Sequence, residues 1–378
     1  MTTQQTGSLE QQLKSYIHTK GPISVRAFME ACLYDPHHGY YRAGNPIGKE
    51  GDFITAPEIS QMFGEMLGVW VVLTWQAMGS PLPLQLIELG PGRGTLMADL
   101  LRTLSKIHPN FEMISVHMVD RSSSLRANQN STLAAFDCPI TWYEKLGDVP
   151  VDPSILIANE FLDCFPIRQF IKTPEAWHER VIGLDANGHF CFGVGDALPK
   201  GMIIPQTFTE AETGSIFEFC PDFESILSDL KRFSSSYPFA GLFIDYGFEG
   251  PQLGESLQAL LKHKTVSPLQ QPGDVDLTAH VDFTAFAALA VAQGHKVFGP
   301  RDQGAFLSQL GIGPRAEILV QNASQVQAEK LASDVVRLVA PEHMGALFKV
   351  LCVTSAQVET PPPFHVTIQP TETGVGEA

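Results

Sequence analysis

The sequence LQLIELGPGRGTLMADLLRTLSK, residues 84–106, gives the first indication of the architecture. It begins with a short apolar run, passes through Gly90, Gly92 and Gly94, and continues in a helical pattern. Because glycine has no Cβ, the backbone can turn tightly at these positions and approach a ligand closely. A helix that starts directly after such a turn offers free N–H groups and the positive end of its dipole to that ligand. The stretch therefore predicts a strand, a binding turn and a helix in succession.

The spacing of the glycines distinguishes two kinds of cofactor. A dinucleotide fingerprint is GxGxxG/A, whose third small residue would fall at Thr95. Residues 88–94 instead read ExGxGxG, starting at Glu88. This run resembles motif I of class I S-adenosylmethionine (SAM) methyltransferases, in which the loop wraps the amino-acid end of the cofactor. A glycine-rich turn without a ligand is the alternative for this motif taken alone.

Short apolar runs alternate with helical patterns along most of the chain, which indicates a parallel sheet with crossover helices. The expected strands, whose unalternating β-branched character fits burial on both faces, are residues 84–90, 113–120, 140–146, 154–161, 240–247, 294–299 and 348–355. The expected helices are residues 58–78, 95–106, 122–136, 222–233, 282–293 and 322–339. We therefore predict an α/β fold of the class I SAM-dependent methyltransferase type, Rossmann-like, with a mostly parallel seven-stranded sheet.

Three regions lie outside this alternation. Ser8 and Gln11 form a capping-box pattern, so a helix is expected at the start of the chain. Residues 23–64 are rich in Gly, Pro, Tyr and His and are expected to form an irregular lid. Strand-like runs in residues 167–215 favour an antiparallel insertion, a candidate substrate subdomain. The expected domains are an N-terminal helical and lid region (1–80), a methyltransferase core (81–358) and a flexible tail (359–378).

The composition excludes several functional classes. Of the 378 residues 44% are hydrophobic and 17% charged, which excludes a disordered chain. A formal charge of −16 disfavours binding to nucleic acid or to an anionic membrane surface. Residues 62–79 are the most apolar helical stretch, but they contain Glu65 and fall short of a membrane span. The six cysteines form no CxxC pair, so no metal site is expected. No signal or transit peptide is found, which favours a bacterial cytoplasmic protein.

Acidic residues near the ends of the next two strands extend the predicted cofactor site. Asp120 ends the strand at 113–120, where a carboxylate can accept two hydrogen bonds from a ribose diol. Capping of the following helix is the alternative. Leu146 and Asp148 follow the next strand, where this fold usually contacts adenine, although such a tripeptide can be a plain turn. Because ligands of open α/β sheets bind at the carboxyl ends of the strands, the motifs in this order predict a SAM site.

The sequence NEFLD, residues 159–163, contains the candidate catalytic residues Asn159, Glu160 and Asp163. In the class I methyltransferase plan this strand end faces the reactive methyl group. Carboxylates can hold a guanidinium by bidentate hydrogen bonds and can take up the proton that a methylated nitrogen releases. Asn159 or Asp163 could instead cap the next element.

Further candidates share a place in the lid or near the substrate cleft. They are Asp52, Thr55, Glu58, Asp245, Tyr246 and His280. The first three are expected to close over SAM, although the second and third could simply start the helix at 58–78. The next two end the fifth strand and could equally be residues of the core edge. The histidine could act as a base or an orienter, although a lone histidine is often structural.

Five blocks together resemble the MidA-like family, also known as the mitochondrial complex I assembly-factor methyltransferases. They are GDFITAPEISQMFGE (51–65), ELGPGRGTL (88–96), IANEFLDCFP (157–166), FIDYG (243–247) and PGDVDLTAHVDF (272–283). The resemblance covers about residues 9–354. It implies a protein substrate, because the mitochondrial member symmetrically dimethylates an arginine of a complex I core subunit during assembly. Carried over, the three glycines become the SAM loop, and Asn159 and Glu160 fall in the fourth-strand block.

Two positions depart from the family pattern. The run Gly254-Glu255-Ser256-Leu257 stands where a Gly-Thr-Leu-Arg run is expected, and Ala56 stands where serine is expected. Two other functions stay open at this point. The first is an assembly chaperone with a methyltransferase-like fold, and the second is a methyltransferase for a small-molecule nucleophile.

Overall fold

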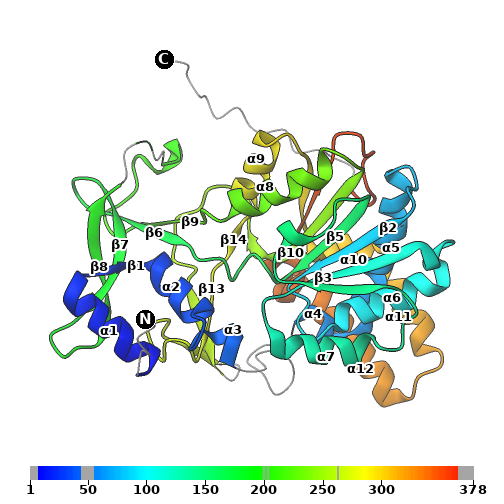
Figure 1. The fold of residues 1–378 in the computed structure, drawn as a ribbon, viewed down its shortest axis with the longest axis horizontal. Helices are drawn as coiled ribbons and strands as arrows, with labels where there is room; N and C mark the ends of the chain where they lie inside the picture. The colour runs from blue at the N-terminus through cyan, green and yellow to red at the C-terminus, as the bar shows by residue number, and fades with distance from the viewer. Residues whose placement is uncertain (1–6, 44–54, 199–200, 202–203, 262–263, 365–378) are drawn as a thin grey trace. The chain divides into compact units, whose positions relative to one another are not determined.

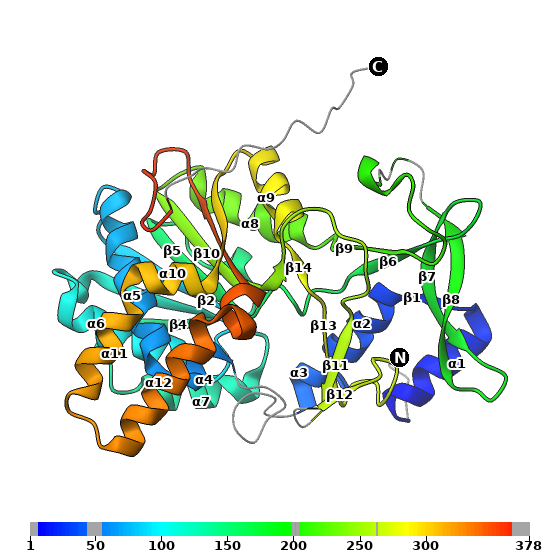
Figure 2. The same ribbon diagram turned by 180° about the vertical axis from the view of Figure 1, so that it is seen from behind.

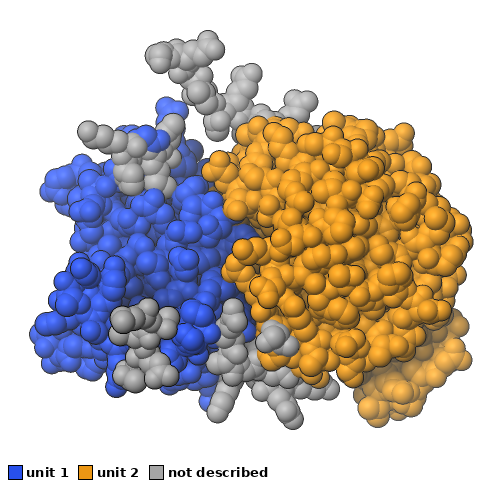
Figure 3. All heavy atoms as spheres, in the orientation of Figure 1, with its two compact units in different colours: residues 1–53, 163–222, 251–280 blue, residues 54–162, 223–250, 281–378 orange. Residues whose placement is uncertain are grey.

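The structure is a computed structural model that describes residues 7–43, 55–198, 201, 204–261 and 264–364. The chain forms two compact units (Figure 3). Unit 1 comprises residues 1–53, 163–222 and 251–280, and unit 2 comprises residues 54–162, 223–250 and 281–378. This division differs from the predicted boundary at residue 80. The first 53 residues group with the predicted insertion, whereas the helix that follows them packs on the core of unit 2.

Unit 2 is built on an eight-stranded sheet of order β15-β16-β10-β5-β2-β3-β4, with β14 beside β10 (Figure 1). Its strands are β2 (Leu84–Leu89), β3 (Ile114–Val119), β4 (Ile140–Tyr143), β5 (Ser154–Asn159), β10 (Phe239–Phe248), β14 (Val281–Asp282), β15 (Lys296–Asp302) and β16 (Phe348–Thr354). All pairs are parallel except those of β16 with β10 and β15. The mostly parallel α/β sheet is confirmed. The predicted count of seven is corrected to eight, because the two residues of β14 add a short strand.

Helices pack against both faces of this sheet. One face carries α5 (Gln61–Ala77) and α6 (Thr95–Ile107), and the other carries α8 (Phe223–Ser234) and α9 (Phe283–Ala292). Consecutive side chains of β10 point to opposite faces of the sheet. Leu242 joins the core cluster that includes α5 and α6, whereas Phe243 packs on Phe286 of α9. The helix α7 (Ser123–Leu133), which connects the parallel strands β3 and β4, contacts α6. The sheet is therefore buried on both sides, as its apolar strands predicted.

Three helices lie between β15 and β16. They are α10 (Gln303–Leu310), α11 (Ile312–Val320) and α12 (Gln325–Val339). Figure 2 shows them on the side of α5, which α10 and α11 contact. Only the last of the three was expected. The helix predicted at 58–78 is also divided, into α4 (Ala56–Ile59) and α5, because Ser60 has an extended backbone and its hydroxyl caps Met62 N at 3.3 Å.

Unit 1 contains a five-stranded antiparallel sheet of order β1-β7-β6-β9, with β8 beside β7. Its strands are β1 (Ile23–Ser24), β6 (Arg168–Lys172), β7 (Trp177–Leu184), β8 (Phe190–Ala197) and β9 (Ile216–Phe219). The predicted antiparallel insertion therefore exists, but it extends beyond residue 215 and includes a strand from the N-terminal region. A second sheet has the order β12-β11-β13, with β11 (Gln258–Leu261), β12 (Lys264–Val266) and β13 (Asp276–Thr278).

The N-terminal part of unit 1 is more regular than predicted. It forms α1 (Leu9–Lys20), α2 (Val25–Tyr34) and α3 (Tyr40–Ala43). The capping box of α1 at Ser8 and Gln11 is confirmed. The expectation of an irregular segment from residue 23 is wrong at α2, because Ser24 Oγ caps Ala27 N at 3.1 Å and Phe28 lies on its buried face. The numerous glycines and prolines that follow obscured this short periodic run.

The structure describes the first part of the predicted flexible tail, residues 359–364. Phe364 is 1% exposed, and its ring packs on those of Phe298 and Phe306 at 6.4 Å and 5.7 Å between centroids. An apolar contact of this kind removes residues 359–364 from the expected flexible tail, and residues 365–378 lie outside the described part of the chain. No helix within the described ranges has the length and apolarity needed to cross a membrane.

Candidate functional site

The glycine turn lies between β2 and α6, as predicted. Gly90, Gly92 and Gly94 have φ values of 61°, 50° and 81°, in the left-handed region that favours glycine. A Cβ at Gly90 would lie 2.9 Å from the Phe161 ring, and one at Gly94 would lie 3.3 Å from Gln129 Cα. The backbone angles disfavour a side chain at all three glycines, and the close neighbours also exclude one at Gly90 and Gly94.

Near this turn, Glu88 Oε2 and Asn159 Oδ1 are buried and have no hydrogen-bond partner among the described residues. The register of β2 and β5 pairs Glu88 with Ile157, so Glu88 and Asn159 project from the same face of neighbouring strands. Burial, and then the charge of Asp120, raise the pKa of Glu88 to about 8. Buried acceptors that the chain leaves unpaired are places where a ligand can supply N–H donors.

Asp120 lies directly after β3 and has two roles in the structure. Its Oδ1 accepts Ser122 N at 2.8 Å, which holds the start of α7, and its Oδ2 accepts Gln129 Nε2 at 2.7 Å. Gln129 Nε2 also donates to the Gly92 carbonyl at 2.8 Å. Sequence reasoning missed Gln129, since a glutamine inside a helix carries no local pattern. Asp120 therefore lies beside the glycine turn, whereas the N-cap of α7 is Ser122, so the alternative of an N-cap at Asp120 is wrong.

The backbone turn after β5 places Glu160 in an unusual conformation, with a φ of 50°. Its Oε1 accepts Asn159 Nδ2 at 3.2 Å and the backbone N–H of Ala56 at 3.0 Å. Asp245 Oδ2 accepts the backbone N–H groups of Phe161 and Leu162, the next two residues, at 3.0 Å and 2.9 Å. Left-handed backbone at a residue other than glycine costs energy and is often found at functional sites. The carboxylate of Glu160 is thus held in a fixed place at the carboxyl end of β5.

Asp245 and Tyr246, predicted either for the substrate cleft or for the core edge, are both buried. Asp245 is 1% exposed and uses its carboxylate on backbone N–H groups. Tyr246 is buried, and its ring packs edge-on against Phe348 at 5.4 Å. These positions favour the alternative of a core-edge role for both residues.

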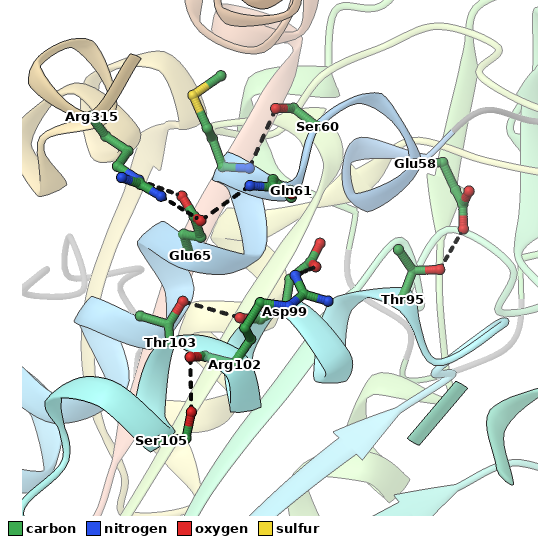
Figure 4. A network of polar contacts seen from close by, with 11 residues as sticks. Glu58, Ser60, Gln61, Glu65, Thr95, Asp99, Arg102, Thr103, Ser105 and Arg315 are labelled. Carbon is green, nitrogen blue, oxygen red and sulfur yellow. Dashed lines mark hydrogen bonds and ion pairs between the residues drawn. The ribbon is translucent and has the colours of Figure 1, made fainter. Parts of the chain in front are cut away.

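The short helix α4 joins two parts of the site. Thr55 occupies its N-cap position without a side-chain capping bond. Glu58 Oε1 accepts the hydroxyl of Thr95, the first residue of α6, at 2.6 Å (Figure 4). Together with the bond from Ala56 N to Glu160, this contact attaches α4 both to the helix after the glycine turn and to the end of β5. Asp52, the other predicted lid residue, lies outside the described residues.

A polar network supports α5 and α6 beneath α4. Figure 4 shows Arg315 of α11 making a bidentate ion pair with Glu65 of α5, at 2.7 Å and 2.9 Å. Asp99 of α6 pairs with Arg102, and burial raises its pKa despite that partner. A Cβ at Gly64 would lie 2.6 Å from Asp99 Cβ, so α5 and α6 approach closely at this point. The Arg315 ion pair therefore holds α5 to α11, and the close packing at Gly64 holds α6, which follows the glycine loop, against α5.

Comparison with known proteins identifies the family. A family model described as an S-adenosyl-L-methionine-dependent methyltransferase matches residues 66–301. The chain belongs to this family. Methyltransferase relatives match it over most of their length. Protein arginine methyltransferase NDUFAF7, mitochondrial, from Xenopus tropicalis is 36% identical over 89% of this chain and 83% of that protein. The human protein of the same name is 34% identical over 90% of this chain and 82% of that one.

A solved structure extends the comparison to the fold. A protein from Burkholderia thailandensis crystallised with S-adenosylhomocysteine is 28% identical, with a TM-score of 0.81 over 93% of this chain and 92% of that one. A native crystal structure from the same organism is 27% identical, with a TM-score of 0.76. The protein is therefore a SAM-dependent methyltransferase with a methyltransferase-like α/β fold, as the glycine spacing predicted.

The residues present in this methyltransferase fit SAM. The glycine turn leaves room for close approach of a ligand to the backbone, and α6 starts directly behind it. Glu88 Oε2 and Asn159 Oδ1, which no described residue pairs, are oxygen atoms that suit the cofactor's ammonium group. Asp120, at the end of β3, is suited to a ribose diol.

Leu146 and Asp148, the remaining cofactor candidates of the methyltransferase, form a short 3₁₀ helix. Leu146 is buried, whereas Asp148 is exposed. The carbonyl of Gly147 between them accepts Arg232 Nη1 of α8 at 2.7 Å. A contact between this turn and adenine stays a prediction.

Asp163 and His280 belong to unit 1. The Asp163 carbonyl accepts Ala279 N at 2.9 Å, and His280 N donates to Ser256 Oγ at 2.9 Å. Burial lowers the pKa of the His280 side chain. Ser256 also donates its N–H and its hydroxyl to the half-buried carboxylate of Glu218, so the segment that departs from the family pattern has a structural role here. The catalytic role of Asp163 and the substrate role of His280 stay predictions.

Proposed function

We propose that this methyltransferase is a protein arginine N-methyltransferase that forms symmetric dimethylarginine on a subunit of respiratory complex I, or on a similar protein, during assembly. The relatives named protein arginine methyltransferase support the arginine substrate. The family resemblance supports the complex I subunit and the symmetric product. The observation that carries the proposal is the Glu160 carboxylate, held by Ala56 N–H and Asn159 at the carboxyl end of β5.

The chain's own residues would align the acceptor nitrogen and handle its proton. SAM supplies a methyl group activated on a sulfonium, so alignment and charge placement are the main contributions left to the protein. Glu160 would bind the guanidinium through charge-assisted hydrogen bonds. It would also favour one nitrogen as the nucleophile and receive the proton that this nitrogen loses. Because Asp245 and Ala56 fix the turn and the carboxylate, little reorganisation would accompany binding.

The test compares the methylation of complex I subunits in bacteria that carry the gene, lack it, or carry Glu160→Gln. The amide of glutamine keeps the shape of the side chain but removes its charge and its capacity to take a proton. We expect one arginine to carry two methyl groups, symmetrically placed, only in cells with the wild-type gene. Mass spectrometry locates the arginine, and its fragmentation distinguishes the symmetric from the asymmetric product. If deletion of the gene leaves arginine methylation of the subunits unchanged, the proposal is wrong.

A purified reaction separates this function from the two alternatives. The protein, labelled SAM and the separate subunits are incubated, and label in protein is compared with label in small molecules. If the protein is a small-molecule methyltransferase, the subunits stay unlabelled. If it is an assembly chaperone, the Gly92→Val variant still restores complex assembly in cells that lack the wild-type gene. We also propose that the protein lies in the bacterial cytoplasm. Fractionation of the same cells, followed by detection of the protein in each fraction, tests this location.

A further inference from the structure

We propose that Gln129 is a positioning residue for SAM binding, because its side-chain amide holds the glycine loop and the Asp120 carboxylate in one fixed arrangement. Gln129 lies within α7 and is 0% exposed. It belongs neither to the glycine motif nor to a strand end. The proposal requires SAM binding alone and is independent of the arginine substrate.

Both ends of the Gln129 amide are used. Nε2 donates to the Gly92 carbonyl at 2.8 Å and to Asp120 Oδ2 at 2.7 Å. Oε1 accepts the indole N–H of Trp142, in β4, at 2.9 Å. A rotated amide would turn its oxygen toward two acceptors and its NH₂ group toward a donor. The Trp142 bond therefore fixes the orientation in which Gln129 serves the other two groups.

The glycine loop needs such an external contact. Gly92 has a left-handed φ of 50° and no side chain of its own, and glycine loses more conformational freedom on folding than any other residue. The hydrogen bond to its carbonyl selects one conformation of the turn. Packing supports the same contact, since a Cβ at Gly94 would lie 3.3 Å from Gln129 Cα. Gln129 thus orders the loop from outside it.

The second contact acts on a pair of carboxyl groups. Burial raises the pKa of both Glu88 and Asp120, and the two charges repel each other. Asp120 accepts Ser122 N and Gln129 Nε2, and it is faced by the guanidinium of Arg126. Glu88 Oε2 has no such donor among the described residues. Gln129 therefore favours the state in which Glu88 holds the proton and Asp120 remains an acceptor.

Loss of the amide should change both the strength and the pH dependence of cofactor binding. Without the Gln129 donor, the pKa of Asp120 rises, and protonated Asp120 offers a ribose diol fewer acceptor sites. The charged groups that face Asp120 are then Glu88 from β2 and Arg126 from α7, with Glu144 lying 3.7 Å from Arg126. Neither of the facing groups replaces the lost hydrogen bond to Oδ2.

The experiment measures binding of S-adenosylhomocysteine by calorimetry between pH 6 and pH 9. Gln129→Met has a similar length but no donor. This variant is expected to bind S-adenosylhomocysteine about ten-fold more weakly at neutral pH, because it loses a hydrogen bond to a charged group. The loss should be larger at pH 6 than at pH 9. Asn130→Ala, at an exposed position of the same helix, is the matched control and should bind like the wild type.

A second variant distinguishes positioning from a loss of packing. Gln129→Glu places an ionised carboxylate against two acceptors at high pH, but its protonated form can donate one hydrogen bond. Relative to Gln129→Met, its affinity should therefore recover as the pH falls. If Gln129→Met does not fold, Trp142→Phe removes the N–H that orients the amide while leaving Gln129 in place, and it should weaken binding by a smaller factor. Affinities within two-fold of the wild type, or equal losses at every pH in both Gln129 variants, would overturn the proposal.

Discussion

The Oδ2 atom of Asp245 lies 2.9 Å from the backbone nitrogen of Leu162 and accepts its hydrogen bond. The same oxygen accepts Phe161 N, so one carboxylate of β10 holds two consecutive peptide groups of the turn after β5. The residue just before them is Glu160, whose φ of 50° places it in the left-handed region. Asp245 therefore contacts the turn directly, and through the backbone of this turn it acts on the position of the Glu160 carboxylate.

Replacement of Asp245 should affect catalysis more than cofactor binding. Asp245→Ala leaves buried N–H groups without an acceptor, at a cost of about 1–3 kcal/mol each in the free energy of unfolding. Asp245→Asn keeps one acceptor oxygen and should retain the fold, with methyl transfer reduced on the order of ten-fold because Glu160 is no longer held. Titration with S-adenosylhomocysteine should give an affinity within two-fold of the wild type. A loss of affinity that matches the loss of rate would show that Asp245 serves the cofactor site instead.

Gly90→Ala should abolish SAM binding. The substitution puts a Cβ 2.9 Å from the Phe161 ring at a φ of 61°, so the loop or the ring must move. Gly188→Ala is the control, since its φ is 77° and nothing lies within 4 Å of its Cβ position. The control should lose about 1–2 kcal/mol of stability from backbone strain alone and keep its cofactor affinity. Thermal unfolding with and without S-adenosylhomocysteine measures both effects, and equal ligand-induced shifts in the two variants would contradict the close-contact argument.

The parts of the site that the sequence predicted are those with a local cause. Gly90, Gly92 and Gly94 were found because a left-handed turn before a helix requires glycine at a fixed spacing. Asp120 was found because strand ends in an open α/β sheet gather at one edge. The strands of unit 2 were also found, because runs buried on both faces have a recognisable composition.

The parts that were missed depend on contacts between distant segments. Gln129 gains its role from the approach of α7 to the glycine loop, which no pattern within the helix reveals. Asp245 was predicted either near the substrate or at the core edge, and its bond to the turn at Leu162 follows from the pairing of β10 with β5. Unit 1 combines three separate segments, so its composition follows from strand pairing such as that of β1 with β7. Local propensity carries no information about such pairing.

The hydrogen bond from Thr95 to Glu58 should couple α4 to cofactor binding. Thr95→Val and Glu58→Gln each weaken this 2.6 Å contact at the first turn of α6. Each is expected to lower the affinity for S-adenosylhomocysteine a few-fold, and the double variant should bind no worse than the weaker single variant. Thr103→Val removes a hydroxyl from the same helix that bonds to the Asp99 carbonyl, and it should leave the affinity unchanged. Additive losses in the double variant would mean that Thr95 and Glu58 act separately.

Glu88 should make the ligand-free protein less stable as the pH rises. Burial, with a contribution from Asp120, raises its pKa from 4.5 to about 8. The folded state therefore binds a proton that the unfolded state releases between these two values. The contribution to stability is fully present below pH 4.5 and is lost as the pH rises through about 8.

Glu88→Gln removes this titration while keeping the shape of the side chain. As the pH rises from 4.5 to about 8, the free energy of unfolding of this variant should increase relative to that of the wild type by up to about 1.4 kcal/mol per pH unit. Urea unfolding at pH 5, 6.5 and 8, with Glu112→Gln as a control at an exposed position, measures the difference. A constant difference over this range would show that Glu88 is ionised throughout, and the arrangement in which it holds the proton beside Asp120 would then be wrong.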